Sequence, residues 1–105
     1  MATSPKLLEM LGQLISIPSV SSTQPEHDIS NQQVIACLAE WLDDLGFQIE
    51  IISSSKDKLN LIAWIGDGDE GLVLSGHTDT VNYDQTGWKT DPFKAERVGE
   101  NIYGL

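Results

Sequence analysis

The chain has 105 residues, enough for one small domain, and 40% of them are hydrophobic, enough to supply a core. Six Lys and Arg against 16 Asp and Glu give a formal net charge of -10. A charge of this sign repels phosphate backbones and anionic membrane surfaces, so we expect neither a nucleic-acid nor a membrane partner.

Cysteine usage and apolar runs indicate where such a chain resides. Cys37 is the single cysteine, so no internal disulfide forms, and its place in a helical apolar pattern predicts an inert thiol. No apolar run approaches the roughly 20 residues of a membrane span. The first residues also lack the uninterrupted apolar segment of a signal peptide. We therefore expect a cytoplasmic protein.

The first predicted element is a helix. Ser4 and Pro5 predict its start, with the serine hydroxyl as N-cap and proline at the first helical position. Apolar residues then recur at helical spacing until Pro18, which ends the pattern: Leu7, Leu8, Leu11, Leu14 and Ile15. Residues 18–24 are rich in Ser, Thr and Val without a helical period. We expect a loop there that turns the chain, with a role in a site as the alternative.

The second predicted helix has one broad apolar face and polar side chains mostly elsewhere. Its apolar face consists of Val34, Ile35, Leu38, Ala39, Trp41, Leu42 and Leu45. Gly46 is well placed to end the helix in a left-handed conformation.

Strand patterns follow this helix. Apolar and polar residues alternate over 47–51, and residues 59–65 form a nearly apolar run, as expected for a strand covered by helices. After an acidic, glycine-rich turn that lacks the spacing of a calcium-binding loop, residues 72–75 predict a third strand. Residues 95–98 and 102–105 predict a short hairpin. Two helices packed on a mixed sheet place the chain in the α/β class.

His77 and Asp79 follow the third predicted strand directly. Because side chains alternate along an extended backbone, the two face one side and Thr78 faces the other. A metal-ligating histidine usually donates its second ring N–H to a carboxylate, so Asp79 suits that role or that of a ligand. Gly76 removes side-chain bulk where a substrate or a second loop approaches.

A His-x-Asp pair by itself leaves several interpretations open. It serves a metal site or it is only a structural hydrogen bond, although a position at a strand end, where α/β folds carry their ligands, favours the metal site. A small acidic binding module that pairs with a partner through a free sheet edge is the alternative from another class. A truncated product that aggregates through such an edge is a third possibility.

Several separated motifs extend this pattern over nearly the whole chain. In chain order they are residues 17–21 (IPSVS), 41–47 (WLDDLGF), 75–81 (SGHTDTV), Trp88, 91–93 (DPF) and 102–105 (IYGL). The set resembles the amino-terminal part of the metal-dependent deacylases and aminopeptidases of the M20 peptidase family. Asn82 departs from the proline common at that position in close members, which affects the path of the following loop.

The resemblance implies roles for two residues of this chain. His77 matches the first metal-ligating histidine of the family, and Asp79 matches the aspartate that orients this histidine and supports catalysis. The other ligands of the two-zinc or two-cobalt centre, and its glutamate base, are implied to lie after Leu105. The implied fold is the amino-terminal portion of a three-layer, zinc-peptidase-like catalytic domain spanning residues 1–105, with the dimerisation domain of the homodimeric family enzymes absent.

The resemblance also implies a reaction, which is the hydrolysis of an N-acyl amino acid. Members that deacetylate N-acetylornithine in arginine biosynthesis are the most similar, with desuccinylation of a diaminopimelate intermediate or dipeptide cleavage as alternatives. Residues 1–105 alone are expected to be inactive. His27 is interpreted as a solvated residue before the second helix, and Asp84 and Asp91 as solvated loop carboxylates.

Overall fold

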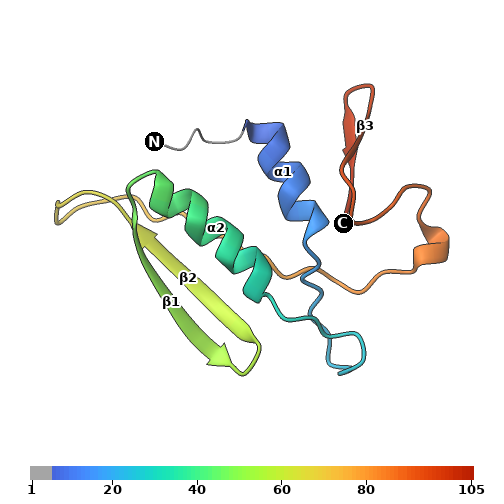
Figure 1. Ribbon diagram of the computed structural model, residues 1–105, viewed down its shortest axis with the longest axis horizontal. Helices are drawn as coiled ribbons and strands as arrows, with labels where there is room; N and C mark the ends of the chain where they lie inside the picture. The colour runs from blue at the N-terminus through green and yellow to red at the C-terminus, as the bar shows by residue number, and fades with distance from the viewer. Residues whose placement is uncertain (1–5) are drawn as a thin grey trace.

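The computed structural model describes residues 6–105 and consists of helices and small antiparallel sheets (Figure 1). In chain order the elements are α1 (Leu7–Ser16), α2 (Gln32–Asp44), β1 (Gln48–Ser55), β2 (Lys58–Trp64), the 3₁₀ helix η1 (Gln85–Gly87), β3 (Glu96–Val98) and β4 (Asn101–Tyr103). The predicted α/β class is confirmed. Within residues 6–105, no helix combines the length and the apolar character needed to cross a membrane.

Helix α1 begins at Leu7, where the carboxylate of Glu9 accepts a hydrogen bond of 3.1 Å from the backbone N–H of Lys6. The predicted capping role of Ser4 and Pro5 lies outside the described residues. The helix ends at Ser16, just before Pro18, as predicted. It lies between α2 and the β3–β4 hairpin (Figure 1).

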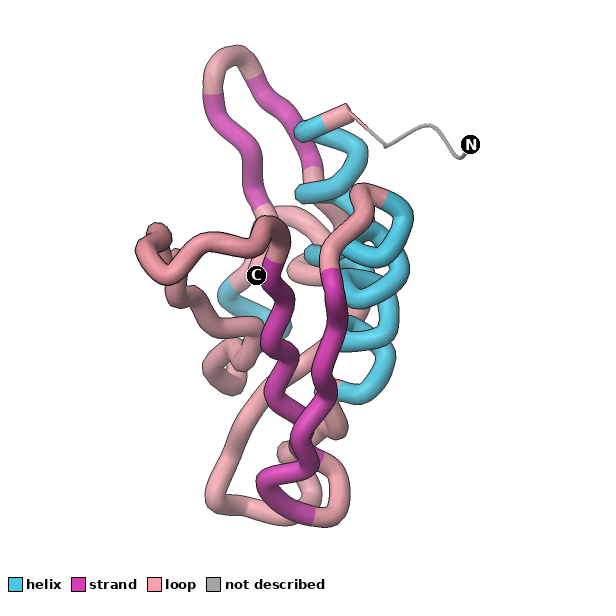
Figure 2. Tube along the Cα trace, turned by 90° about the vertical axis from the view of Figure 1, so that its left-hand side faces the viewer, coloured by secondary structure: helices cyan, strands magenta, loops and turns pink. Residues whose placement is uncertain are grey.

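Helix α2 covers one face of the β1–β2 hairpin, which Figure 2 shows with the strands in front of the helices. Gly46, with φ of +90°, ends this helix turn as predicted. The antiparallel register pairs Ile51 with Leu61, and every second residue from these positions lies on the same face of the hairpin, toward α2. The opposite face exposes Ile62 and Trp64, so within residues 6–105 only one face of β2 is covered.

The predicted third strand over residues 72–75 is wrong for this structure. These residues belong to no strand, and the side chains of Leu72, Val73 and Leu74 are 85%, 89% and 86% exposed. The apolar run indicates a segment suited to burial, but a strand also requires a neighbouring backbone that forms hydrogen bonds with its N–H and C=O groups. Within the described residues β2 pairs only with β1, and the predicted mixed sheet is present as two antiparallel pairs.

The loop before α2 is fastened to β2 by an asparagine side chain. The Asn31 Nδ2 group donates to the Leu59 carbonyl at 2.8 Å, and the Leu59 N–H donates to Asn31 Oδ1 at 2.8 Å. The amide therefore pairs with the strand as a neighbouring backbone would. Nearby, Asp28 accepts from the Ser22 N–H at 2.9 Å and contacts Lys58 Nζ at 3.1 Å. Both contacts lower the pKa of Asp28, and the hydrogen bond from Ser22 has the larger effect.

The last residues pack against α1. The Leu105 N–H donates to the Pro92 carbonyl at 2.7 Å, and Tyr83 and Phe93 meet edge to face at 5.1 Å between ring centroids. This packing brings Gly104 so close to Ile15 that a Cβ on the glycine would lie 2.9 Å from two side-chain carbons of Ile15. A side chain at position 104 would therefore force Ile15 to move. The predicted hairpin of residues 95–98 and 102–105 is confirmed as β3–β4.

We expect Gly104→Ala to destabilise the chain by about 1–3 kcal/mol, because the added methyl group overpacks the contact with Ile15. Gly71→Ala is the matched control, since nothing lies within 4 Å of the added carbon there, and it should change stability by less than about 0.5 kcal/mol. Urea unfolding followed by circular dichroism measures both. Equal stability of the two variants would show that the contact with Ile15 is not tight.

Candidate functional site

The His77–Asp79 segment is fastened to the loop after α1 by a short parallel pairing. The Ser21 N–H donates to the Thr80 carbonyl at 2.9 Å, and the Thr80 N–H donates to the Ser19 carbonyl at 3.2 Å, which makes a bridge between Val20 and Thr80. The Ser19 hydroxyl adds a third bond, to the Thr78 carbonyl, at 2.6 Å. Val20 is only 1% exposed, so this pairing lies at the best-buried point of the described chain.

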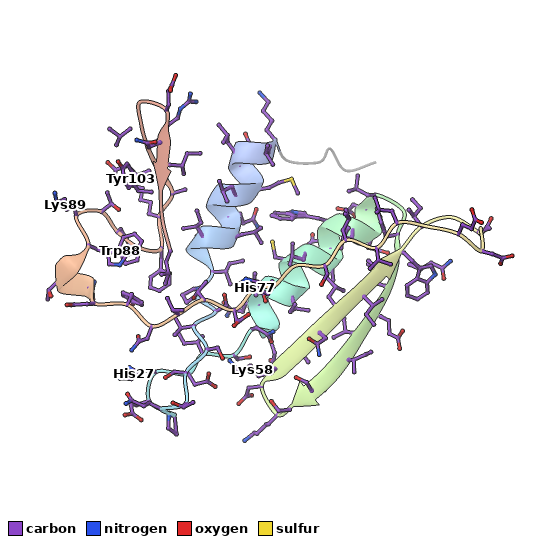
Figure 3. All side chains as sticks on the ribbon, turned by 180° about the vertical axis from the view of Figure 1, so that it is seen from behind. His27, Lys58, His77, Trp88, Lys89 and Tyr103 are labelled. Atoms are coloured by element: carbon purple, nitrogen blue, oxygen red, sulfur yellow. The ribbon has the colours of Figure 1, made fainter. Side chains whose placement is uncertain are left out.

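The pairing separates the motif into two faces, as predicted from the alternation of an extended backbone. Thr78 and Thr80 are half-buried, whereas the side chains of His77 and Asp79 are 80% and 63% exposed. Figure 3 shows His77 where this segment crosses in front of α2. The site therefore presents an imidazole and a carboxylate outward from a backbone that is anchored from the other side.

The contact within the pair sets the histidine tautomer. His77 Nδ1 lies 3.1 Å from the Asp79 Oδ1 atom and 3.1 Å from the Asp79 backbone oxygen. Both oxygens are hydrogen-bond acceptors, so the neutral tautomer that satisfies these contacts has its proton on Nδ1 and a free lone pair on Nε2. This is the arrangement of a histidine that ligates a metal through one ring nitrogen while a carboxylate holds the other.

Two clefts adjoin the motif. One, of about 200 Å³, lies between α1 and the motif, and is lined by Thr78, Thr80, Ser19 and apolar residues such as Leu14 and Phe93. The other, of about 490 Å³, separates residues 76–79 from α2 and β2. His77 borders both clefts. The motif is thus bounded by concave surface on two sides.

The donor set of the described chain fits one corner of a metal site. Among residues 6–105, no three His, Cys, Asp or Glu side chains gather closely enough to hold an ion. His77 with Asp79 fits as a ligand and its supporting carboxylate.

The other candidate residues of the sequence are exposed or form hydrogen bonds away from the His77–Asp79 pair. His27 is exposed in the loop before α2, away from His77 (Figure 3), as predicted. Asp84 caps η1 and accepts from the Thr86 hydroxyl and N–H, and these bonds lower its pKa. Asp91 accepts from the Phe93 N–H at 3.0 Å. Burial, with a smaller effect of Glu40, raises the pKa of the half-buried Cys37 thiol, in keeping with an inert cysteine.

The supporting role of residues 19–21 is what the sequence interpretation missed. A loop that turns the chain was preferred there, whereas the structure uses it to hold the motif. The available signal was Val20, a β-branched apolar residue between two serines in an otherwise polar loop. Such a residue favours an extended, buried backbone.

Comparison with known proteins bears on this site. No family model matches the chain. Acetylornithine deacetylases are 47% identical over 103 residues in Pasteurella multocida (strain Pm70), 48% over 101 in Aliivibrio salmonicida (strain LFI1238) and 45% over 103 in Proteus mirabilis (strain HI4320). This chain is homologous to acetylornithine deacetylases. The resemblance inferred from the motifs is therefore confirmed.

The homology covers the chain and its relatives unequally. Each of the three alignments includes 96% of this chain but only 27% of the acetylornithine deacetylase it matches. The chain therefore spans about a quarter of the length of these relatives. The matched region includes the His77–Asp79 pair.

Thr80 gives a direct test of the packing beneath the motif. Its hydroxyl oxygen is buried and has no hydrogen-bond partner among the described residues. We expect Thr80→Val to stabilise the chain by about 1 kcal/mol, because it removes an unpaired buried hydroxyl at nearly constant volume.

Thr86→Val is the control for this substitution, since it removes a hydroxyl that is bonded to Asp84 at 2.6 Å, and should not stabilise the chain. Urea unfolding measures both variants. A loss of stability in Thr80→Val would show that this hydroxyl is satisfied.

Proposed function

We propose that this chain is the amino-terminal portion of the catalytic domain of a metal-dependent N-acyl amide hydrolase. The proposed reaction is the deacetylation of N-acetylornithine to ornithine and acetate, in arginine biosynthesis in the cytoplasm, by a homodimeric enzyme. The observation that carries the proposal is the His77–Asp79 contact of 3.1 Å within a chain 45–48% identical to acetylornithine deacetylases. The homology weighs against the alternative of an acidic interaction module.

In this proposal His77 is a metal ligand through Nε2. Its Nδ1 proton is held by Asp79, which fixes the ring orientation and raises the basicity of the ligating nitrogen. Asp79 would support catalysis in this way, by orienting the ligating histidine. The exposed position of both side chains leaves the metal-facing side accessible to substrate.

A pair of zinc or cobalt ions, when bound, supplies Lewis-acid polarisation of the acyl carbonyl and activation of the attacking water. A catalytic zinc site typically takes three protein ligands, and residues 6–105 bring no such group together. We therefore infer that residues 1–105 by themselves do not hydrolyse N-acetylornithine. The remaining ligands and the general base are assigned to other parts of the full-length enzyme.

A chimaeric enzyme tests the proposal. We expect this chain, substituted for the 103 residues that it matches in the Pasteurella multocida acetylornithine deacetylase, to yield a metal-dependent N-acetylornithine deacetylase. In the chimaera, His77→Ala should lower kcat at least about 100-fold because a ligand is lost, and Asp79→Asn should lower metal affinity about 10–100-fold. Ornithine release and bound-metal analysis measure these effects.

His27→Ala in the same chimaera is the matched control and should retain full activity, because His27 lies in a separate, exposed loop. A folded chimaera that deacetylates N-acetylornithine equally well with and without His77 would contradict the proposal.

A further inference from the structure

We propose that Ser19 is the positioning residue of the His77–Asp79 pair. Its hydroxyl fixes the register in which residues 77–80 lie against residues 19–21, and thereby sets which side chains of the motif face outward. The use of the pair in hydrolysis rests on the proposed function, whereas the positioning by Ser19 is a property of the described chain.

The placement of the hydroxyl is the first observation. Ser19 is only 5% exposed, and it is the buried polar residue of the described chain. Its Oγ donates to the Thr78 carbonyl at 2.6 Å, across 59 residues of sequence. A buried hydroxyl is costly unless it is paired, and this bond pairs the hydroxyl of Ser19.

The position of the accepting carbonyl is the second observation. The Thr78 carbonyl belongs to the peptide group that joins Thr78 to Asp79, so Ser19 holds the backbone between the two functional side chains. The flanking bonds of the Val20–Thr80 bridge act only at Thr80, two residues after Thr78. Ser19 is therefore the contact that extends the anchoring to the His-x-Asp segment itself.

Register decides the chemistry of this segment. Side chains alternate with a period of two along an extended backbone, so a slip of one residue would turn His77 and Asp79 inward and expose Thr78 and Thr80. Two backbone bonds from a single bridge are a weak constraint against such a slip. The side-chain bond of Ser19 supplies the third point of attachment.

Nuclear magnetic resonance of the 105-residue chain, without metal or substrate, tests the proposal. In Ser19→Ala we expect the amides of Ser21 and Thr80 to exchange about three- to tenfold faster, while amides of α2 and β2 keep their rates. The ring nitrogen shifts of His77 should move toward those of Asp79→Ala, because the ring loses its fixed relation to the carboxylate.

Two variants provide matched comparisons. Ser21→Ala removes an exposed hydroxyl from the same segment and leaves the backbone bridge in place, so it should behave as the wild type. Ser19→Thr keeps the hydroxyl and should restore the wild-type His77 signals, since the adjoining cleft of about 200 Å³ has room for a methyl group. If Ser19→Ala does not fold, Ser19→Cys, with similar volume and a weak donor, replaces it.

Equal acceleration of all amides in the Ser19 variant, or unchanged His77 ring signals, would overturn the proposal and leave Ser19 a residue of general stability. Failure of the chimaeric deacetylase would not produce either result, because this experiment uses no metal and no substrate. Failure of one proposal can therefore be distinguished from failure of the other.

Discussion

The parallel bridge between residues 19–21 and 78–80 is the contact on which the site depends. It joins the end of α1 to the His77–Asp79 motif, nearly 60 residues away, at the position of the best-buried side chain, Val20. Its consequence is the separation of faces. The threonines of the motif turn inward, and the histidine and aspartate turn outward with Nδ1 and Oδ1 3.1 Å apart.

The rest of the fold holds this bridge in place with little buried apolar surface. Among residues 6–105 the buried apolar core consists of Val20, Val34 and Ile35. Polar contacts add to it, among them the paired amide of Asn31 on β2. The apolar segment at 72–74 and the outer face of β2 are exposed, and exposed apolar patches commonly mark surfaces that contact other protein. These features suit a chain homologous to about a quarter of an acetylornithine deacetylase.

Local patterns predicted the elements whose stabilising contacts are local. Both helices, the strands β1 and β2, the end of α2 at Gly46 and the shared face of His77 and Asp79 followed from spacing and alternation. The third strand could not be predicted correctly, since an apolar run does not say whether a partner backbone is present. The role of Ser19 was missed because its partner, the Thr78 carbonyl, is distant in sequence and carries no residue-type signal.

We propose that the anchored His77–Asp79 pair is the metal-facing part of this chain. A titration of the isotope-labelled chain with Co²⁺, followed through paramagnetic effects on its amide and side-chain signals, is the decisive measurement. We expect effects that are largest at His77 and Asp79 and extend to the adjoining residues 19–21, with His27 unaffected. Paramagnetic effects centred on His27 and the acidic loop around it, with none at residues 76–80, would contradict it.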